Sequence, residues 1–137
     1  MQLFDFFKML KNMKLVWKRK WIKRKKANAV NYLGKEVILK IVEPLGSRHP
    51  QYGFIYMINF RYVPDPMSGD GEELDAYLIG KFEPVPSSKG RIIAVMHGIN
   101  DDDDKLAVSK NGEEYLDEAI RALTELQERF FHSVIIR

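Results

Sequence analysis

Short apolar segments, separated by loop-forming residues, fill most of the chain beyond residue 30. Five of them are rich in β-branched and aromatic residues and short enough for strands, spanning residues 37–42, 54–63, 74–79, 91–97 and 105–108. Proline, glycine and serine punctuate the intervals, as at 44–50, 64–66 and 83–88. No helical pattern separates the strands. The sequence therefore predicts a small barrel or closed sheet and argues against a parallel α/β fold.

The last third of the chain contains one segment with a helical period. Apolar residues recur there every three or four positions, at Leu116, Ala119, Ile120, Leu123, Leu126 and Phe130. Asn111 and Glu114 have the spacing of a capping box at or just before its start. Residues 134–136 form a final apolar run that we expect to return as an edge strand. The predicted class is α+β, mainly β, with a C-terminal helix.

The N-terminal segment has a different pattern. Between residues 3 and 22, apolar residues recur at three- to four-residue spacing with lysines between them, which predicts a basic amphipathic helix. Such a helix suits an anionic membrane surface, a nucleic-acid backbone or a partner groove. It equally suits packing on its own domain or a second subunit, or a dispensable extension. We place a domain boundary near Ala29, with an extension over 1–29 and a body over 30–137.

Composition and charge narrow the class of protein. The 137 residues are 45% hydrophobic, enough for one domain with a core. There is no cysteine, so thiolate metal sites and disulfides are excluded. No apolar run approaches a membrane span or a secretory signal, and we expect a cytoplasmic location. Residues 1–29 carry ten Lys and Arg against Asp5, a charge of +9, so the remainder of the +3 chain carries −6. An acidic body suits metal cations better than nucleic acid.

The first acidic cluster lies in a glycine turn that leads into the strand predicted at 74–79. Asp70, Glu72 and Asp75 stand at positions i, i+2 and i+5 across this turn. Residues i and i+2 of a strand face the same side, so Asp70 and Glu72 can share one target. Hard cations such as Mg²⁺ prefer oxygen ligands of this kind. The same residues also suit a solvated surface turn.

A second acidic cluster, Asp101 to Asp104, follows the strand predicted at 91–97 and is closed by Lys105. Four consecutive carboxylates repel one another, so they are either exposed to solvent or held together by cations. The two clusters lie about 30 residues apart. In a small barrel they can meet at one mouth and form a joint metal site.

Five motifs follow one another along the body of the chain. They are Pro44-Leu45-Gly46-Ser47-x-His49-Pro50, Asn59-x-x-Tyr62-Val63, Asp70-Gly71-Glu72-Glu73-Leu74-Asp75, the aspartate run closed by Asp104-Lys105, and Phe130-Phe131 after Glu128-Arg129. In this order they resemble the motifs of the soluble family I inorganic pyrophosphatases, in particular a short bacterial pyrophosphatase-like branch. The resemblance covers residues 31–137.

The resemblance implies a fold, an activity and a set of site residues. The fold is an OB-like five-stranded barrel, and the activity is Mg²⁺-dependent hydrolysis of pyrophosphate by a metal-bound hydroxide. Mn²⁺ is a second candidate metal, and a homo-oligomer is expected. The implied metal ligands are Asp70, Glu72, Asp75, Asp101, Asp103 and Asp104. Asp70, Glu72 and Lys105 are implied in catalysis, with Glu72 orienting the attacking water. The implied phosphate ligands are Arg48, Tyr62 and Lys105.

The sequence also departs from the family pattern. Glu72 replaces a shorter aspartate, Lys40 stands where the first strand has an acid, and Phe60 replaces a tyrosine. The Tyr-Lys pair expected after Phe131 is absent, and Arg48 and Arg61 are the nearest substitutes for lost phosphate ligands. Two alternatives therefore stay open. One is a metal- and phosphate-binding module that has lost catalysis. The other is a carrier body whose basic extension attaches to anionic membrane or nucleic acid.

The three histidines are weaker candidates. His49 lies in the Ser-Arg-His-Pro loop, where it is a candidate phosphate contact, although a lone loop histidine is more often structural. His97 ends a predicted strand beside the aspartate run and is a candidate metal ligand. His132 is expected on the surface of the terminal helix.

Overall fold

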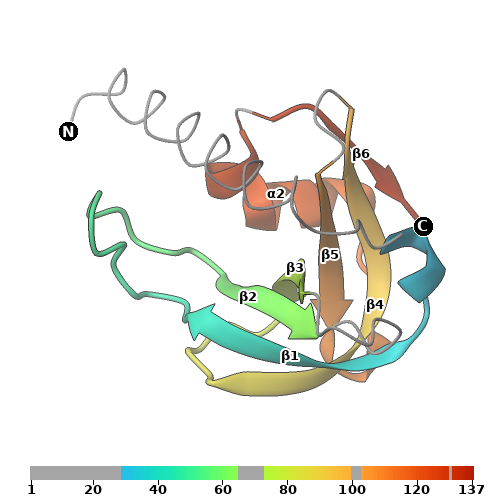
Figure 1. The fold of residues 1–137 in the computed structure, drawn as a ribbon, viewed down its shortest axis with the longest axis horizontal. Coiled ribbons are helices and arrows are strands. Elements are labelled where there is room, and N and C mark those ends of the chain that lie inside the picture. Colours follow the sequence, from blue (N-terminus) through green and yellow to red (C-terminus); the bar gives the residue numbers. More distant parts are fainter. Residues whose placement is uncertain (1–28, 65–72, 100–102, 130) are drawn as a thin grey trace.

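The computed structural model describes residues 29–64, 73–99, 103–129 and 131–137 (Figure 1). In chain order the elements are the 3-10 turn η1 (Ala29–Tyr32), β1 (Glu36–Glu43), β2 (Asn59–Pro64), β3 (Glu73–Ile79), β4 (Ser87–Gly98), β5 (Asp104–Ser109), the 3-10 turn η2 (Lys110–Gly112), α2 (Asp117–Glu128) and β6 (Ser133–Ile136). The basic helix expected over residues 3–22 lies outside the described residues.

The strands form a closed barrel. Their order is β1-β2-β3-β5-β4-β6, and a further pairing between β1 and β4 closes the ring. β1 pairs with β4 through Glu36 to Lys40 and with β2 from Lys40 onward, so one strand serves two neighbours. β6 pairs with the end of β4 that β1 leaves free. The predicted five-stranded barrel with a C-terminal helix and a late edge strand is confirmed (Figure 1).

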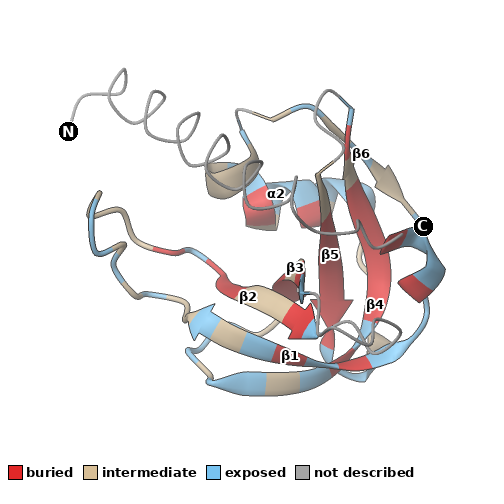
Figure 2. Cartoon of the chain, viewed as in Figure 1, coloured by how far each residue is buried: buried red, intermediate tan, exposed pale blue. Residues whose placement is uncertain are grey.

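Strand alternation divides the buried side chains into two cores. Figure 2 shows that buried residues predominate along β4 and β5. The barrel interior is filled by one face of each strand, including Leu74, Ala76 and Leu78 of β3. The opposite face of β3, with Tyr77 and Ile79, joins a second core that includes Ile120 of α2. The helix therefore covers the outer wall of the barrel along β3, β5 and β4. Every second side chain of these strands faces outward, and the apolar side of the helix packs on them.

One pairing was not expected from the sequence. β3 and β5 lie side by side in parallel, with Ala76 opposite Leu106 and Leu78 opposite Val108. The twelve-residue β4 passes to the far side of β5 and pairs with it antiparallel. As a result, β3 and β5 begin at the same edge of the sheet, and each is preceded by an acidic cluster.

The strand expected over residues 54–63 is shorter than predicted and begins at Asn59. Residues 47–56 instead form a separate arm, in which His49 N donates to Phe54 O at 2.8 Å and Tyr56 N to Ser47 O at 2.9 Å. The His49 ring stacks on Phe54, with ring centroids 4.9 Å apart. The aromatic residues that resemble a strand thus pack around His49, which makes this histidine a structural residue of the arm.

The predicted capping box is wrong. Asn111 lies in η2 with a left-handed φ of 61°, and α2 starts after Leu116, whose side chain cannot cap. The helix ends at Glu128, so His132 lies beyond it, exposed as expected.

Candidate functional site

One outward-facing row of side chains crosses four strands of the barrel. Lys40 of β1 lies opposite Tyr62 of β2, and Tyr62 lies opposite Asp75 of β3. The parallel pairing of Ala76 with Leu106 then brings Lys105 of β5 beside Asp75. Residues directly opposite one another share a face, so the row presents a cation, a phenol, a carboxylate and a second cation on one wall. Three of these residues, Tyr62, Asp75 and Lys105, were assigned to the site from the sequence.

Asp75 is the electrostatic centre of this row. Burial raises the pKa of its carboxyl to about 6, against the lowering effect of Lys105 and Arg61, while the charges of Asp103 and Glu73 raise it further. Two cations nearby therefore do not fully offset the cost of holding this carboxylate out of water. An additional positive charge at Asp75 is favoured.

The aspartates at the start of β5 separate onto two faces. Asp103 directly precedes β5, two residues before Lys105, and its charge raises the pKa of Asp75. Asp104 lies one residue further, and its Oδ1 is 2.6 Å from Nδ1 of His97, its register partner on β4. Its side chain is only 11% exposed. The structure thus pairs Asp104 with His97.

Lys105 is held by a carboxylate from the helix. Its Nζ forms an ion pair with Oε2 of Glu128, the last residue of α2, and lies 4.7 Å from the centroid of the Phe131 ring. The Tyr77 hydroxyl donates to the same Oε2 at 2.7 Å. Burial and the Glu128 charge raise the pKa of Tyr77 well above its ordinary value, so the phenol stays protonated. The sequence did not single out Glu128 or Tyr77, because their contacts join positions 23 and 51 residues apart.

A second ion pair flanks the row on the side of β1. Arg61 Nη1 lies 3.1 Å from Oε1 of Glu43. Burial raises the pKa of Glu43, and burial together with the Glu43 charge raises the pKa of Tyr56 to about 12. Among the described residues Glu43 Oε2 is buried without a hydrogen-bond partner. The charge of Arg61 favours the ionised form of Asp75, although its register partners Ile41 and Ala76 belong to the barrel interior.

Arg48, the arginine assigned to phosphate from the sequence, lies in the arm. Its Nη1 donates to the carbonyl of Gly53 at 2.8 Å, and its backbone bridges to Ile55. The side chain is therefore directed along the arm. Within the described part of the chain, no contact joins Arg48 to Asp75 or Lys105.

The predicted metal ligands are only partly covered. Asp70, Glu72 and Asp101 lie outside the described residues, while Asp75, Asp103 and Asp104 lie inside them. The described ranges contain no group of three or more His, Asp or Glu side chains that could hold a metal ion. They do contain Asp75, whose buried charge favours a cation.

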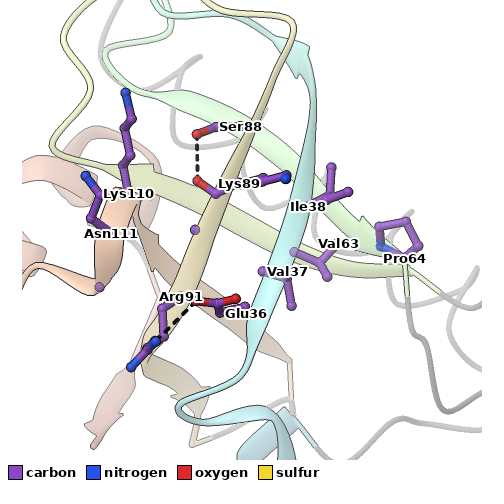
Figure 3. Close-up of a pocket in the computed structure, with 12 residues that line it drawn as sticks. Glu36, Val37, Ile38, Val63, Pro64, Ser88, Lys89, Arg91, Lys110 and Asn111 are labelled. Atoms are coloured by element: carbon purple, nitrogen blue, oxygen red, sulfur yellow. Dashed lines mark hydrogen bonds and ion pairs between the residues drawn. The ribbon is translucent and has the colours of Figure 1, made fainter.

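A separate cavity of about 840 Å³ opens between β1, the end of β2, β4 and η2 (Figure 3). The apolar part of its lining consists of Val37, Ile38, Val63 and Pro64. The basic part consists of Lys89, Arg91 and Lys110. Arg91 is paired with Glu36 at 3.2 Å, and the side chains of Lys89 and Lys110 point in different directions. Of the described site residues predicted from sequence, none lines this cavity. The row on the outer wall and this cavity are therefore different features.

Across the described ranges, the model contains no helix with the length and apolar character needed to cross a bilayer.

Comparison with known proteins places the fold. No family model matches the chain. A search of curated proteins likewise finds no match. Among solved structures, the inorganic pyrophosphatase of Ehrlichia chaffeensis is similar, with a TM-score of 0.55 and 14% identity over 74% of this chain and 84% of that one. An inorganic pyrophosphatase of Neisseria gonorrhoeae is 22% identical over 79% of this chain and 77% of its own, with a TM-score of 0.46. The barrel and its helix thus have the fold of inorganic pyrophosphatases, as the similarity to the first of these structures shows.

Proposed function

We propose that this protein is a Mg²⁺-dependent hydrolase of inorganic pyrophosphate and belongs to the family I pyrophosphatases. The observation that carries the proposal is the row on the outer wall. It places Asp75, Asp103 and Lys105 at the common starting edge of β3 and β5. Carboxylates for metals beside cations for phosphate are the parts that phosphoanhydride hydrolysis requires. The fold itself supports the proposal only as an analogy.

Each residue has a proposed role. Asp70, Asp75, Asp101 and Asp103 hold Mg²⁺ or Mn²⁺, with Glu72 as a further ligand. The sequence also assigned Asp104 to the metal, but its side chain pairs with His97 on the other face of β5, so we leave it out of the proposed ligand set. When bound, the metal lowers the pKa of a water molecule and offsets the charge of the phosphates. Glu72 orients the attacking water.

Cations and a phenol face the substrate. Lys105 and Arg61 compensate phosphate charge beside Asp75, and Tyr62 offers a hydroxyl from the neighbouring strand. Lys40 lies in the same row and adds a cation at its end, on the far side of Tyr62. Lys40 and Arg61 supply part of the positive charge for phosphate that is lost with the missing phosphate ligands of the family pattern. The expected role of Arg48 stays a prediction; its Nη1 donates to the Gly53 carbonyl in the arm.

The direct experiment measures phosphate release from pyrophosphate by the full chain with Mg²⁺, with Mn²⁺ and with a chelator. We expect turnover with either metal and none with the chelator. A phosphate monoester such as p-nitrophenyl phosphate serves as the control substrate, and we expect it to be hydrolysed much more slowly. Absence of release from pyrophosphate under both metals would reject the enzymatic proposal.

A second candidate function is a metal- and phosphate-binding module without turnover. It is favoured by the Arg48 side chain, which is bonded to its own arm, and by Phe60, which is buried against Tyr77 with ring centroids 4.7 Å apart. This candidate predicts saturable Mg²⁺ uptake in calorimetry without phosphate release. Turnover would reject it, and so would a chain that takes up no metal.

A cytoplasmic location, a homo-oligomer and attachment through residues 1–29 stay predictions from the sequence. The last is tested by co-sedimentation of the full chain with vesicles that contain anionic lipid. Replacing the four basic residues at 23–26 by glutamine should weaken this binding, and raising the salt concentration should do the same.

A further inference from the structure

Glu128 occupies an unusual place for a carboxylate. It is the last residue of α2, where the helix dipole disfavours a negative charge. Its side chain is nevertheless only 12% exposed. A buried carboxylate at this end of a helix needs compensation from outside the helix.

Two strands supply that compensation to a single oxygen. Lys105 of β5 pairs with Oε2 of Glu128, and Tyr77 of β3 donates a hydrogen bond to the same atom at 2.7 Å. The Phe131 ring lies against the Lys105 ammonium, 4.7 Å from its centroid. The ammonium is therefore fixed by a carboxylate on one side and a ring on another.

The fixed ammonium belongs to the row on the outer wall, next to the carboxylate of that row, Asp75. Lys105 follows Asp103 by two residues and is adjacent to Asp75 through the β3–β5 register. Its charge is the largest influence that favours the ionised form of Asp75. Lys105 thus pairs with Glu128 of the helix through its side chain and is the neighbour of Asp75 in the sheet.

We propose that Glu128 is a positioning residue that holds the Lys105 ammonium at the edge of the carboxylate site, ready to contact a phosphate of the substrate. This inference rests on the proposed function. A lysine side chain has a flexible four-carbon stem and loses rotamer freedom when it binds a phosphate. The contact with Glu128 removes that freedom before substrate arrives, because the stem is already ordered against the wall of the barrel.

A double-mutant cycle tests whether Glu128 acts through Lys105. The variants are Glu128→Gln, Lys105→Met and the combination, all in the full chain, with kcat and KM measured for pyrophosphate. We expect Glu128→Gln to lower kcat/KM about 10- to 100-fold, the range typical of residues that orient a ligand. In the Lys105→Met background the same change should cost less than about twofold, because there is no ammonium left to position. Equal losses in both backgrounds would overturn the inference in favour of a purely structural role.

Glu125 provides a matched control on the same helix. It pairs with Arg129 at 2.6 Å and is 54% exposed, so Glu125→Gln also removes a carboxylate from an ion pair of α2. We expect this variant to keep kcat/KM within about twofold of the parent, since exposed pairs contribute little. If Glu125→Gln lowered kcat/KM as much as Glu128→Gln does, the loss would come from the total charge of the helix and not from the contact with Lys105.

Binding supplies a second readout that does not depend on turnover. Calorimetry with Mg²⁺ and methylenediphosphonate, a pyrophosphate analogue that is not hydrolysed, measures Kd through the same cycle. We expect Glu128→Gln to weaken binding only where Lys105 is present. Coupled losses in binding without any hydrolysis by the parent would reject the proposed reaction and support the inference. Additive losses, or no binding by the parent, would overturn the inference. If Glu128→Gln does not fold, Glu128→Asp replaces it, because the shorter side chain withdraws the carboxylate from Lys105.

Discussion

Asp75 connects the local chemistry of this protein with its stability. Its carboxyl is ionised at neutral pH at a cost, because the folded environment raises its pKa from the ordinary 3.8 to about 6. A raised pKa means that the folded state binds the proton more tightly than the unfolded state. In the absence of metal, Asp75 therefore makes its full contribution to the free energy of unfolding below about pH 4. This contribution is lost as the pH rises through 6.

Replacing Asp75 by asparagine should remove this cost. In chelator-treated protein at pH 7.5 we expect Asp75→Asn to be more stable than the parent by about 3 kcal/mol, the order given by a shift of this size. Near pH 4 the two proteins should be equally stable. Urea unfolding at both pH values measures the difference. A gain of equal size at both pH values, or no gain, would contradict the electrostatic description of Asp75.

The sequence predicted Asp75 and Asp103 because clusters of acidic residues at strand ends form a recognisable local pattern, while Lys105 and Tyr62 were implied by the family resemblance. It could not predict Glu128, Tyr77 or Glu43. Each of these acts through contacts that depend on which strand lies next to which, and nothing local signals the parallel β3–β5 pair. Arg48 was assigned from a loop motif, and the structure bonds it to Gly53 because the arm turns back on itself.

At the scale of elements, the docking of α2 depends on the turn after β3. Gly80 has a φ of 88°, and a Cβ added to it would lie 2.2 Å from the Tyr115 hydroxyl. Gly46 has nearly the same φ, 87°, with nothing within 4 Å of an added Cβ. The two glycines share a backbone conformation and differ in the space around them.

Alanine substitutions at these two positions should separate strain from packing. Gly46→Ala should destabilise the protein by about 1 kcal/mol, the order of a left-handed backbone strain. Gly80→Ala should cost about 1 kcal/mol more, because the Tyr115 side chain must turn away from the added methyl group. Urea unfolding measures both. Tyr115→Phe should recover part of the Gly80→Ala loss, and equal effects of the two alanines would show that Tyr115 is not held against Gly80.

The start of α2 offers a stabilising change. Leu116 has the extended backbone of an N-cap, φ −63° and ψ 152°, but its side chain is 75% exposed and cannot accept a hydrogen bond. Leu116→Ser should stabilise the protein by about 1 kcal/mol, because a serine oxygen can accept from a free helix N–H. Leu116→Ala is the matched control and should gain little. Thermal unfolding of the three proteins decides the matter, and a serine variant no more stable than the alanine variant would contradict this assignment of the N-cap.

Strands were predictable because alternation and β-branched runs are local, and four of the five expected strands lie close to their predicted ranges. The exception, residues 54–63, shows the limit of the pattern. Phe54 and Tyr56 fit a strand in composition, yet they pack around the ring of His49 in the arm. The N-cap was mispredicted for a similar reason, since η2 takes Asn111 into a left-handed turn.

For the whole molecule, the acidic body predicts that metal binding stabilises the fold. Carboxylates that repel one another in the free protein become ligands when Mg²⁺ binds, and binding to the folded state alone shifts the unfolding equilibrium. At a Mg²⁺ concentration about 100 times the Kd, the gain should be about 2.7 kcal/mol. For a domain of this size that corresponds to a rise in Tm of about 5–15 °C.

The same measurement identifies the site. Asp75→Asn should lose most of the Mg²⁺-dependent rise in Tm, while Glu118→Gln, an exposed change on α2, should retain it. Potassium chloride at equal ionic strength controls for general screening. A rise of the same size in the Asp75 variant would place the metal elsewhere.

The most direct test of the proposed function is kcat/KM for pyrophosphate at saturating Mg²⁺ in the parent, Asp75→Asn and Glu118→Gln. We predict turnover by the parent and by Glu118→Gln, and a loss of at least about 100-fold in Asp75→Asn, the order expected when metal and phosphate are no longer held in line. Turnover that survives unchanged in Asp75→Asn, or no turnover by the parent, would contradict it.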